Sequence, residues 1–207
     1  MTQDQGYYPG GGMLSPNRDI FYLNIPKNAS TYLTNILKDN SWTHWNILDN
    51  SESIKTTIAF IRDPVDRWVS GFATYAALHL FGYGYGSDHF VEDYNDLSKR
   101  IIFDQIIFDD HTDLQVKYVK QIQEHNPVFF RYNKNLITQI NSFLGYDLNT
   151  TVTISANKSE SNYDTNQVSQ FLKKQLDHNP DLKARVIRHY KQDYEFINSI
   201  EFYNDPR

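Results

Sequence analysis

The segment at residues 21–33 is Phe21-Tyr22-Leu23-Asn24-Ile25-Pro26-Lys27-Asn28-Ala29-Ser30-Thr31-Tyr32-Leu33. Its first part is typical of a buried strand, Pro26 begins a short polar turn, and helix-compatible sequence follows from about Thr31. The first N–H groups of a helix have no intrahelical partner and carry partial positive charge, so a phosphate or sulfate can bind there. This order of elements predicts an anion site, to which Lys27 and the hydroxyls of Ser30 and Thr31 would contribute.

The turn does not indicate a nucleoside-triphosphate loop of the Walker type. It contains no glycine, and Lys27 precedes the small residues instead of following them. A simpler interpretation of the same residues is that the strand ends at Pro26 and that Ser30 or Thr31 is the N-cap of the helix.

The composition is that of a globular protein. The chain has 207 residues, of which 40% are hydrophobic and 22% are charged, so one domain is favoured over two and over disorder. A formal net charge of -5 argues against a nucleic-acid binder. The absence of cysteine excludes disulfides, thiolate nucleophiles and Cys-based zinc sites, and the 7 histidines form no metal-binding pattern, so no metal is expected.

The N-terminal part, residues 1–17, is polar and contains Pro9 followed by three glycines. This composition predicts a flexible tail, with a single folded domain over residues 18–207. The sequence shows neither an apolar leader segment nor an apolar window of membrane-spanning length, and a cytoplasmic protein without a membrane partner is therefore expected.

A second strand-to-helix junction follows at residues 56–72. Residues 56–61 are β-branched or apolar, as in a strand that is buried on both faces of a parallel sheet. Arg62 comes next, Asp63 is suited as the N-cap of the following helix, and Pro64 is suited as its first residue. The helix is expected to bury one stripe of side chains and to leave Arg67 and Ser70 on a neighbouring face. That stripe comprises Val65, Trp68, Val69, Phe72 and Ala76.

The rest of the chain continues this alternation of strands and helices. Further strands are predicted at residues 44–48 and 127–132, and further helices at residues 97–108, 111–124, 135–143, 166–176 and from residue 180 past Ile197. The pattern predicts an α/β fold of three layers, in which helices flank a mainly parallel sheet. In such sheets ligands bind beyond the carboxyl ends of the strands, which is where both junctions fall.

Together the two junctions resemble those of the sulfotransferases that use 3′-phosphoadenosine-5′-phosphosulfate, in particular the carbohydrate and membrane-associated branch. The likeness extends over most of residues 20–200 and includes His111-Thr112-Asp113-Leu114-Gln115, Asn157-Lys158-Ser159 and Tyr190-x-x-Asp193-Tyr194. The spacer between the junctions is short for this family, and the chain shows no membrane anchor. The resemblance implies that the first loop binds the 5′-phosphosulfate and that Arg62 and Ser70 bind the 3′-phosphate. The loop residues concerned are Lys27, Asn28, Ala29, Ser30 and Thr31.

The activity that this resemblance implies is transfer of a sulfuryl group to a hydroxyl of a glycan or a small glycosylated metabolite. The product of the donor would be 3′,5′-adenosine bisphosphate, the reaction would need no metal, and Lys27 would stabilise the charge on the bridging oxygen. A catalytically inactive nucleotide-binding module of the same fold and an atypical nucleotide-dependent kinase are the alternatives.

The acceptor hydroxyl needs a general base, for which His44 is the first candidate. Its segment resembles the one that bears the catalytic histidine of a uronosyl 2-O-sulfotransferase, and an imidazole can accept a proton near neutral pH. His44 could instead belong to an aromatic core cluster with its neighbouring tryptophans. Asp49, Glu52 and His111 are the other candidates for the base.

Two further segments could contact the ligands. Lys158 and Ser159 could cover the nucleotide, and the tyrosines of a glycine-rich loop, Tyr83 and Tyr85, could stack on a sugar ring. A solvated loop and a passive turn are the simpler interpretations of these segments.

Overall fold

The computed structural model describes residues 10–49, 51, 53–76, 97–99, 106–107, 109–150 and 165–203. The chain forms two compact units: residues 1–62, 115–156 and 196–207 make the first, and residues 63–114 and 157–195 make the second. Hydrophobic core clusters lie within each unit. The expectation of one domain over residues 18–207 stays a prediction.

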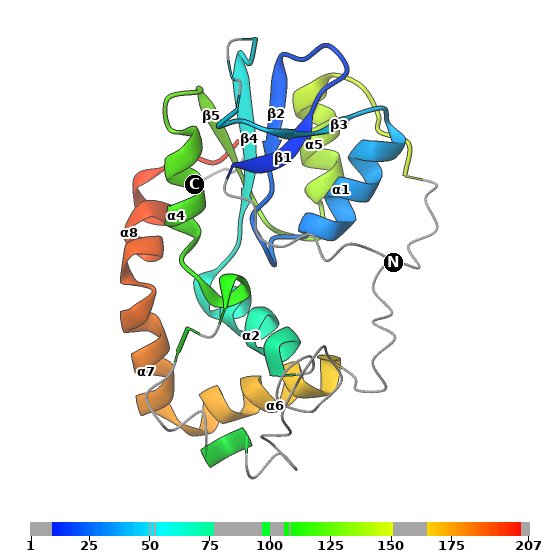
Figure 1. Ribbon diagram of the computed structural model, residues 1–207. Helices are drawn as coiled ribbons and strands as arrows, with labels where there is room; N and C mark the ends of the chain where they lie inside the picture. The colour runs from blue at the N-terminus through cyan, green and yellow to red at the C-terminus, as the bar shows by residue number, and fades with distance from the viewer. Residues whose placement is uncertain are drawn as a thin grey trace. The chain divides into compact units, whose positions relative to one another are not determined.

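The first unit contains a five-stranded sheet with the order β3-β1-β2-β4-β5 (Figure 1). β2 pairs in parallel with β4, and β4 with β5, whereas β1 runs antiparallel to both β2 and β3. The predicted α/β class is therefore confirmed, and the parallel part of the sheet is confined to β2, β4 and β5. The strands are β1 (Gly11–Leu14), β2 (Ile20–Leu23), β3 (Thr43–Asn46), β4 (Thr56–Ile61) and β5 (Pro127–Arg131).

β1 corrects the prediction of a flexible tail over residues 1–17. Residues 11–14 form a strand between β3 and β2, and the side chain of Met13 is fully buried. A Cβ added to Gly12 would lie 1.9 Å from the Tyr22 carbonyl oxygen and 2.6 Å from Cζ of the Phe21 ring. Glycine is needed at this position for close packing inside a strand, so its presence does not indicate a flexible tail. Residues 1–9 lie outside the described residues.

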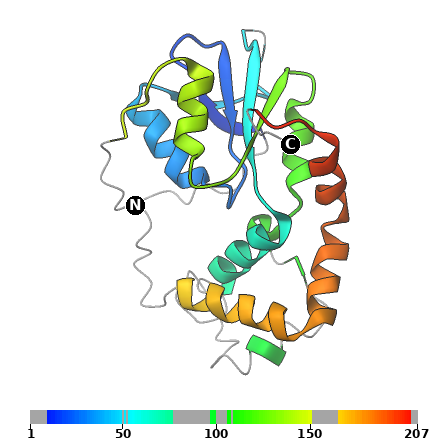
Figure 2. The same ribbon diagram turned by 180° about the vertical axis from the view of Figure 1, so that it is seen from behind.

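Helices lie on both faces of this sheet, as the opposite views of Figures 1 and 2 show. The face that carries Tyr22, Ile58 and Phe60 packs against α1 (Ser30–Asp39) and α5 (Leu136–Leu144). The opposite face carries Phe21, Leu23, Ala59 and Ile61 and packs against α4 (Gln115–Val119), η3 (Lys120–Ile122) and the last residues of α8 (Lys191–Ser199). Successive residues of β2 and β4 thus enter different cores, which explains their continuous apolar sequences.

The second unit is helical in its described part. It contains α2 (Pro64–Tyr75), η2 (Asp110–Thr112), α6 (Thr165–His178), α7 (Pro180–His189) and the first residues of α8. The predicted stripe of α2 packs in its core with side chains of α6 and α7, including Leu172 and Val186. The predicted N-cap is confirmed, because Asp63 Oδ1 accepts hydrogen bonds from the N–H groups of Val65 and Asp66 at 2.9 and 3.0 Å.

Several predicted helices have different bounds in the structure. The last one is divided at Tyr190, whose φ of -89° and ψ of 19° separate α7 from α8. The helix expected at residues 111–124 is broken into η2, α4 and η3. Of the helix expected at residues 97–108, residues 97–99 are helical and most of the others lie outside the described residues. None of the helices in the described ranges has both the length and the apolar character that crossing a membrane requires.

Candidate functional site

The turn between β2 and α1 has an unusual backbone. Among the described residues, five non-glycine residues have a positive φ, and two of them are Lys27 at 67° and Ala29 at 62°. Asn28, between them, does not have a positive φ. L-residues rarely adopt the left-handed region, and its occurrence at a loop is a reason to look for a function. Alternation of left-handed and other conformations can direct successive N–H groups into one concavity that binds anions.

α1 begins directly after this turn, and its N-terminus has no side-chain cap. The N-cap residue is Ala29, and no cap hydrogen bond from a side chain is made in the described structure. The interpretation in which Ser30 or Thr31 is the N-cap is therefore wrong. The N–H groups of Ser30 and Thr31 belong to the first helical turn, where helix geometry gives them no intrahelical acceptor, and they lie next to the Lys27 turn as predicted.

Asn28 holds the turn from inside. Its side chain is 1% exposed, and Nδ2 donates to the Phe60 carbonyl oxygen at 2.7 Å and to Gln115 Oε1 at 2.6 Å. Its backbone N–H donates to the Ile25 carbonyl oxygen at 3.2 Å. Asn28 therefore anchors the turn to β4, and any donation from its N–H to a ligand would compete with the contact to Ile25.

Gln115 joins the turn to the end of β4. It is fully buried, its Oε1 accepts from the Arg62 backbone N–H at 3.0 Å, and its Nε2 donates to the Arg62 carbonyl oxygen at 2.8 Å. The sequence suggested Gln115 only as part of a family resemblance and gave it no role. A detectable signal was a lone polar residue at the start of an otherwise apolar face of α4.

The Arg62 side chain brings a second cation to the same edge of the sheet. Nη1 donates to the Lys27 carbonyl oxygen at 2.9 Å, and the guanidinium carbon lies 4.9 Å from the centre of the Tyr132 ring. The carbonyl and the aromatic face orient the guanidinium. Lys27 and Arg62, which the sequence placed in two separate motifs, are thus brought together in the first unit. This edge combines two cations with helix N–H donors, a combination suited to a phosphate or sulfate.

His44 lies in β3, the outer strand, and its side chain is exposed. It is paired through Met13 with Tyr22, so it lies two strands, or about 10 Å, from β2. The alternative in which His44 belongs to an aromatic core is wrong, because it is exposed while Trp42 is buried. The structure does not bring His44 into contact with Lys27, and its role as base stays a prediction.

Asp49 lies in the turn that follows β3 and is exposed. Gly11 of β1 pairs with Asn46 at the end of β3, and its carbonyl oxygen accepts from the Asn24 N–H at 3.0 Å. The end of β3 is therefore level with Asn24, the residue that follows β2. The Asp49 turn is therefore further along the strand direction, toward the Lys27 edge, than His44. Glu52 lies outside the described residues.

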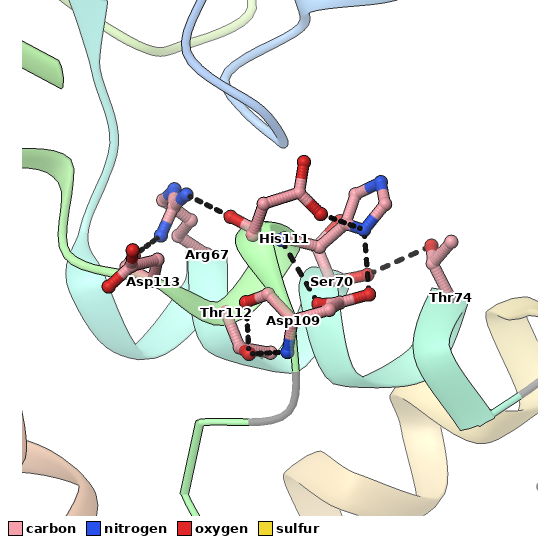
Figure 3. A network of polar contacts seen from close by, with 8 residues as sticks. Arg67, Ser70, Thr74, Asp109, His111, Thr112 and Asp113 are labelled. Atoms are coloured by element: carbon pink, nitrogen blue, oxygen red, sulfur yellow. Dashed lines mark hydrogen bonds and ion pairs between the residues drawn. The ribbon is translucent and has the colours of Figure 1, made fainter. Parts of the chain in front are cut away.

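Arg67 and Ser70 lie on α2 of the second unit, where the sequence placed them beside the apolar stripe. The Arg67 side chain is fully buried and donates to the backbone carbonyls of Asp113 and Asp110 (Figure 3). Arg67 therefore ties α2 to the segment around η2. Ser70 lies one turn further on α2, half-buried, and its carbonyl accepts from Thr74 Oγ1 at 3.2 Å. Ser70 belongs to the second unit and Arg62 to the first.

Asp109, Asp110 and His111 form a cluster, of which Figure 3 shows Asp109 beside His111. His111 Nδ1 lies 2.9 Å from Asp109 Oδ2 and 3.2 Å from Asp110 Oδ1. The possible ligand atoms of the three residues lie within 4.8 Å of one another, a grouping that no pattern in the sequence indicated. Asp109 also caps η2 in a capping box with Thr112, so these contacts are explained by local structure.

Two tyrosines of the second unit have raised pKa values. Burial raises the pKa of Tyr190, whose hydroxyl donates to the Thr112 carbonyl oxygen. Burial, followed by the charge of Asp63, raises the pKa of Tyr194 to about 12, and the Tyr194 hydroxyl donates to Asp63 Oδ2 at 3.4 Å. Both residues, which the sequence linked to a family motif, therefore have structural contacts to the segments around α2.

The remaining candidates, Tyr83, Tyr85, Lys158 and Ser159, lie outside the described residues. Comparisons of the chain with protein-family models, with curated proteins and with solved structures found no match.

Proposed function

We propose that this protein is a sulfotransferase that uses 3′-phosphoadenosine-5′-phosphosulfate as the donor and a hydroxyl as the acceptor. The acceptor would be a glycan or a small glycosylated metabolite. The proposal combines the resemblance of the two sequence motifs with the geometry of the residues that carry them.

The observation that carries the proposal is the backbone of the Lys27 turn. Lys27 and Ala29 are held in the left-handed region directly before the ten-residue helix α1, whose N-terminus has no side-chain cap among the described residues. Holding a residue in a sparsely populated conformation costs about 1–3 kcal/mol, and such costs are concentrated at functional sites. A turn of this kind supports an anion site, and the Arg62 guanidinium adds a second cation beside it.

In the proposed reaction the acceptor oxygen attacks sulfur in line with the bond to the leaving phosphate. A new S–O bond forms, the S–O bond to the phosphate breaks, the bond's electron pair stays on the bisphosphate, and the acceptor proton passes to a base. Lys27 would stabilise the negative charge that develops on the bridging oxygen, and the N–H groups of Ser30 and Thr31 would hold the peripheral oxygens. Arg62 would orient the nucleotide by charge-assisted hydrogen bonds, with Ser70 as a further proposed ligand of the 3′-phosphate.

The base is proposed to be His44, with Asp49, Glu52 and His111 as the other candidates. The register of β3 favours a comparison of His44 with Asp49 in particular, because the Asp49 turn lies further toward the edge that carries Lys27. An imidazole is the better base at neutral pH, since an exposed carboxylate is a weak one.

The test is to incubate the protein with the sulfate donor and a panel of hydroxylated acceptors and to search for sulfated products by mass spectrometry. Parallel reactions contain ATP in place of the sulfate donor, and Lys27→Ala is the catalytic control. We expect a sulfated product with wild type and a much lower yield with the variant. Binding of 3′,5′-adenosine bisphosphate without any product would favour an inactive nucleotide-binding module, and phosphorylated products from ATP would favour a kinase.

A further inference from the structure

We infer that Gln115 is a positioning residue of this anion site, which holds the Lys27 turn and Arg62 in one fixed arrangement. The inference rests on the proposed function, because it concerns the geometry in which the donor would be bound. Gln115 itself is fully buried, so it would act through the residues that it contacts.

Both polar atoms of the Gln115 carboxamide form hydrogen bonds with the Arg62 backbone. Oε1 accepts from the Arg62 N–H at 3.0 Å, and Nε2 donates to the Arg62 carbonyl oxygen at 2.8 Å. These are the two hydrogen bonds that a residue of a neighbouring strand would make in a sheet. β4 ends at Ile61, so the side chain fixes the backbone of the first residue after the strand.

The same oxygen also holds the turn. Gln115 Oε1 accepts from Asn28 Nδ2 at 2.6 Å, and Asn28 Nδ2 donates in addition to the Phe60 carbonyl oxygen at 2.7 Å. One buried oxygen therefore binds the turn after β2 and the residue after β4. A movement of either segment would leave buried polar groups unsatisfied, which is costly.

By fixing the Arg62 backbone, Gln115 also fixes the point from which the Arg62 side chain extends. The Arg62 guanidinium donates to the Lys27 carbonyl oxygen at 2.9 Å, and Lys27 is the residue before Asn28. Gln115, Asn28, Lys27 and Arg62 thus form a closed ring of contacts. We expect that opening the ring at Gln115 changes the spacing between the two cations that would bind the nucleotide.

Only a carboxamide of this length can make all of these contacts. Methionine has a similar length but neither donor nor acceptor, and glutamate keeps the acceptor but places a second oxygen against the Arg62 carbonyl. Gln115→Met therefore removes all of these contacts, whereas Gln115→Glu keeps those of Oε1 and replaces the donation from Nε2 by repulsion between two oxygens. Gln139→Met is the matched control, because Gln139 lies on α5 and its buried Oε1 makes no hydrogen bond in the described part of the chain.

The experiment is calorimetric titration with 3′,5′-adenosine bisphosphate, at a temperature at which circular dichroism shows each variant to be folded. We expect Gln115→Met to weaken binding about tenfold and Gln139→Met to change it less than about twofold. In the Arg62→Ala background the effect of Gln115→Met should fall to about threefold or less, because residues that act through one another are not additive. If Gln115→Met does not fold, Gln115→Glu takes its place, with a smaller loss of binding that still exceeds about twofold, because only the Nε2 contact is replaced by repulsion.

Binding by Gln115→Met within about twofold of wild type would overturn the inference, and so would an unchanged effect in the Arg62→Ala background. Both outcomes leave the proposed function intact, since wild type still binds. Failure of wild type itself to bind the bisphosphate would overturn the proposed function and this inference with it. In turnover assays, the KM for the sulfate donor should rise in Gln115→Met while the KM for the acceptor stays unchanged, a split that a general loss of stability would not produce.

Discussion

The Arg62 guanidinium donates from Nη1 to the Lys27 carbonyl oxygen at 2.9 Å. The two residues are 35 positions apart, and each follows one of two adjacent parallel strands, β2 and β4. Because parallel strands end at the same edge of a sheet, the contact joins the two motifs that the sequence identified separately. If the proposed anion site exists, nucleotide binding should depend on both cations, which can be measured.

Replacement of Arg62 should weaken nucleotide binding more than replacement of a nearby arginine. We expect Arg62→Ala to raise the Kd for 3′,5′-adenosine bisphosphate at least about tenfold, because a charge-assisted contact is lost. Arg131→Ala is the control: Arg131 is exposed at the end of β5, with its guanidinium 4.2 Å from the centre of the Phe202 ring. Equal Kd values for the two variants, measured by calorimetry, would contradict the role of Arg62.

Lys27 combines a proposed catalytic charge with a left-handed backbone at φ 67°, and two substitutions separate these properties. Glycine adopts this conformation without steric cost, so Lys27→Gly should be more stable than Lys27→Ala by about 1 kcal/mol. Both variants should lose sulfuryl transfer by at least about a hundredfold, because both lack the charge. Thermal unfolding and the product assay measure the two properties, and Lys38→Ala, in the last turn of α1, is the control for loss of a lysine.

The general base can be assigned by comparing His44→Ala with Asp49→Asn. Loss of a general base lowers turnover by about 10²–10⁴-fold, and neither substitution should change bisphosphate binding. We expect the large loss in His44→Ala and a small one in Asp49→Asn. Unchanged turnover in His44→Ala would contradict this assignment. A large loss in Asp49→Asn alone would identify Asp49, in the turn after β3, as the base.

The sequence was sufficient to predict the local elements around the site. The strand at residues 56–61, the Asp63 N-cap and the helix before Gly145 are present as expected, because each depends on residues close together in the chain. The Lys27 turn was recognised from its residues as well. Its left-handed backbone was not, since neither Lys27 nor Ala29 has an intrinsic preference for positive φ.

Contacts between distant segments could not be predicted. Gly12 suggested a flexible tail, but glycine is required there because a side chain would collide with the Phe21 ring and the Tyr22 carbonyl in the neighbouring strand. That contact cannot be seen in the local sequence. Helical periodicity placed Arg67 beside the apolar stripe but did not show that it is fully buried, with the backbone carbonyls of residues 110 and 113 as its acceptors. The contacts of Gln115 could not be predicted either, since its hydrogen-bond partners Asn28 and Arg62 lie after β2 and β4. The environments of Arg67 and Gln115 therefore come from segments that are remote in the sequence, and local sequence patterns do not show them.

Gly71 offers a test of the packing between α2 and η2. A Cβ at this position would lie 2.3 Å from the His111 carbonyl oxygen and 2.8 Å from its carbonyl carbon. Because both atoms are backbone, η2 would have to move, and we expect Gly71→Ala to destabilise the protein by about 1–3 kcal/mol despite the better helix propensity of alanine. Ser70→Ala, one residue earlier, should change the unfolding free energy by less than about 0.5 kcal/mol. Urea unfolding measures both, and an equally stable Gly71→Ala would contradict the close contact.

The contact between Tyr194 and Asp63 predicts a dependence of stability on alkaline pH. The pKa of Tyr194 is about 12 in the folded protein against an ordinary value of 10.0, with burial as the first cause and the Asp63 charge as the second. Since the folded pKa is the higher one, the folded state retains a proton that the unfolded state releases. The stabilising contribution of Tyr194 is therefore fully present below about pH 10 and is lost as the pH rises toward about 12.

Tyr194→Phe tests this dependence, because phenylalanine keeps the ring and removes the titrating hydroxyl. Burial also raises the pKa values of Tyr22 and Tyr190, so the variant should retain a decline in stability with rising pH, but a shallower one. We expect the difference in unfolding free energy between wild type and variant to be constant up to about pH 9 and to change in favour of the variant above about pH 10. Urea unfolding over this range measures it. Parallel pH profiles for the two proteins up to the alkaline limit would show that the Tyr194 hydroxyl titrates alike in the folded and unfolded chains.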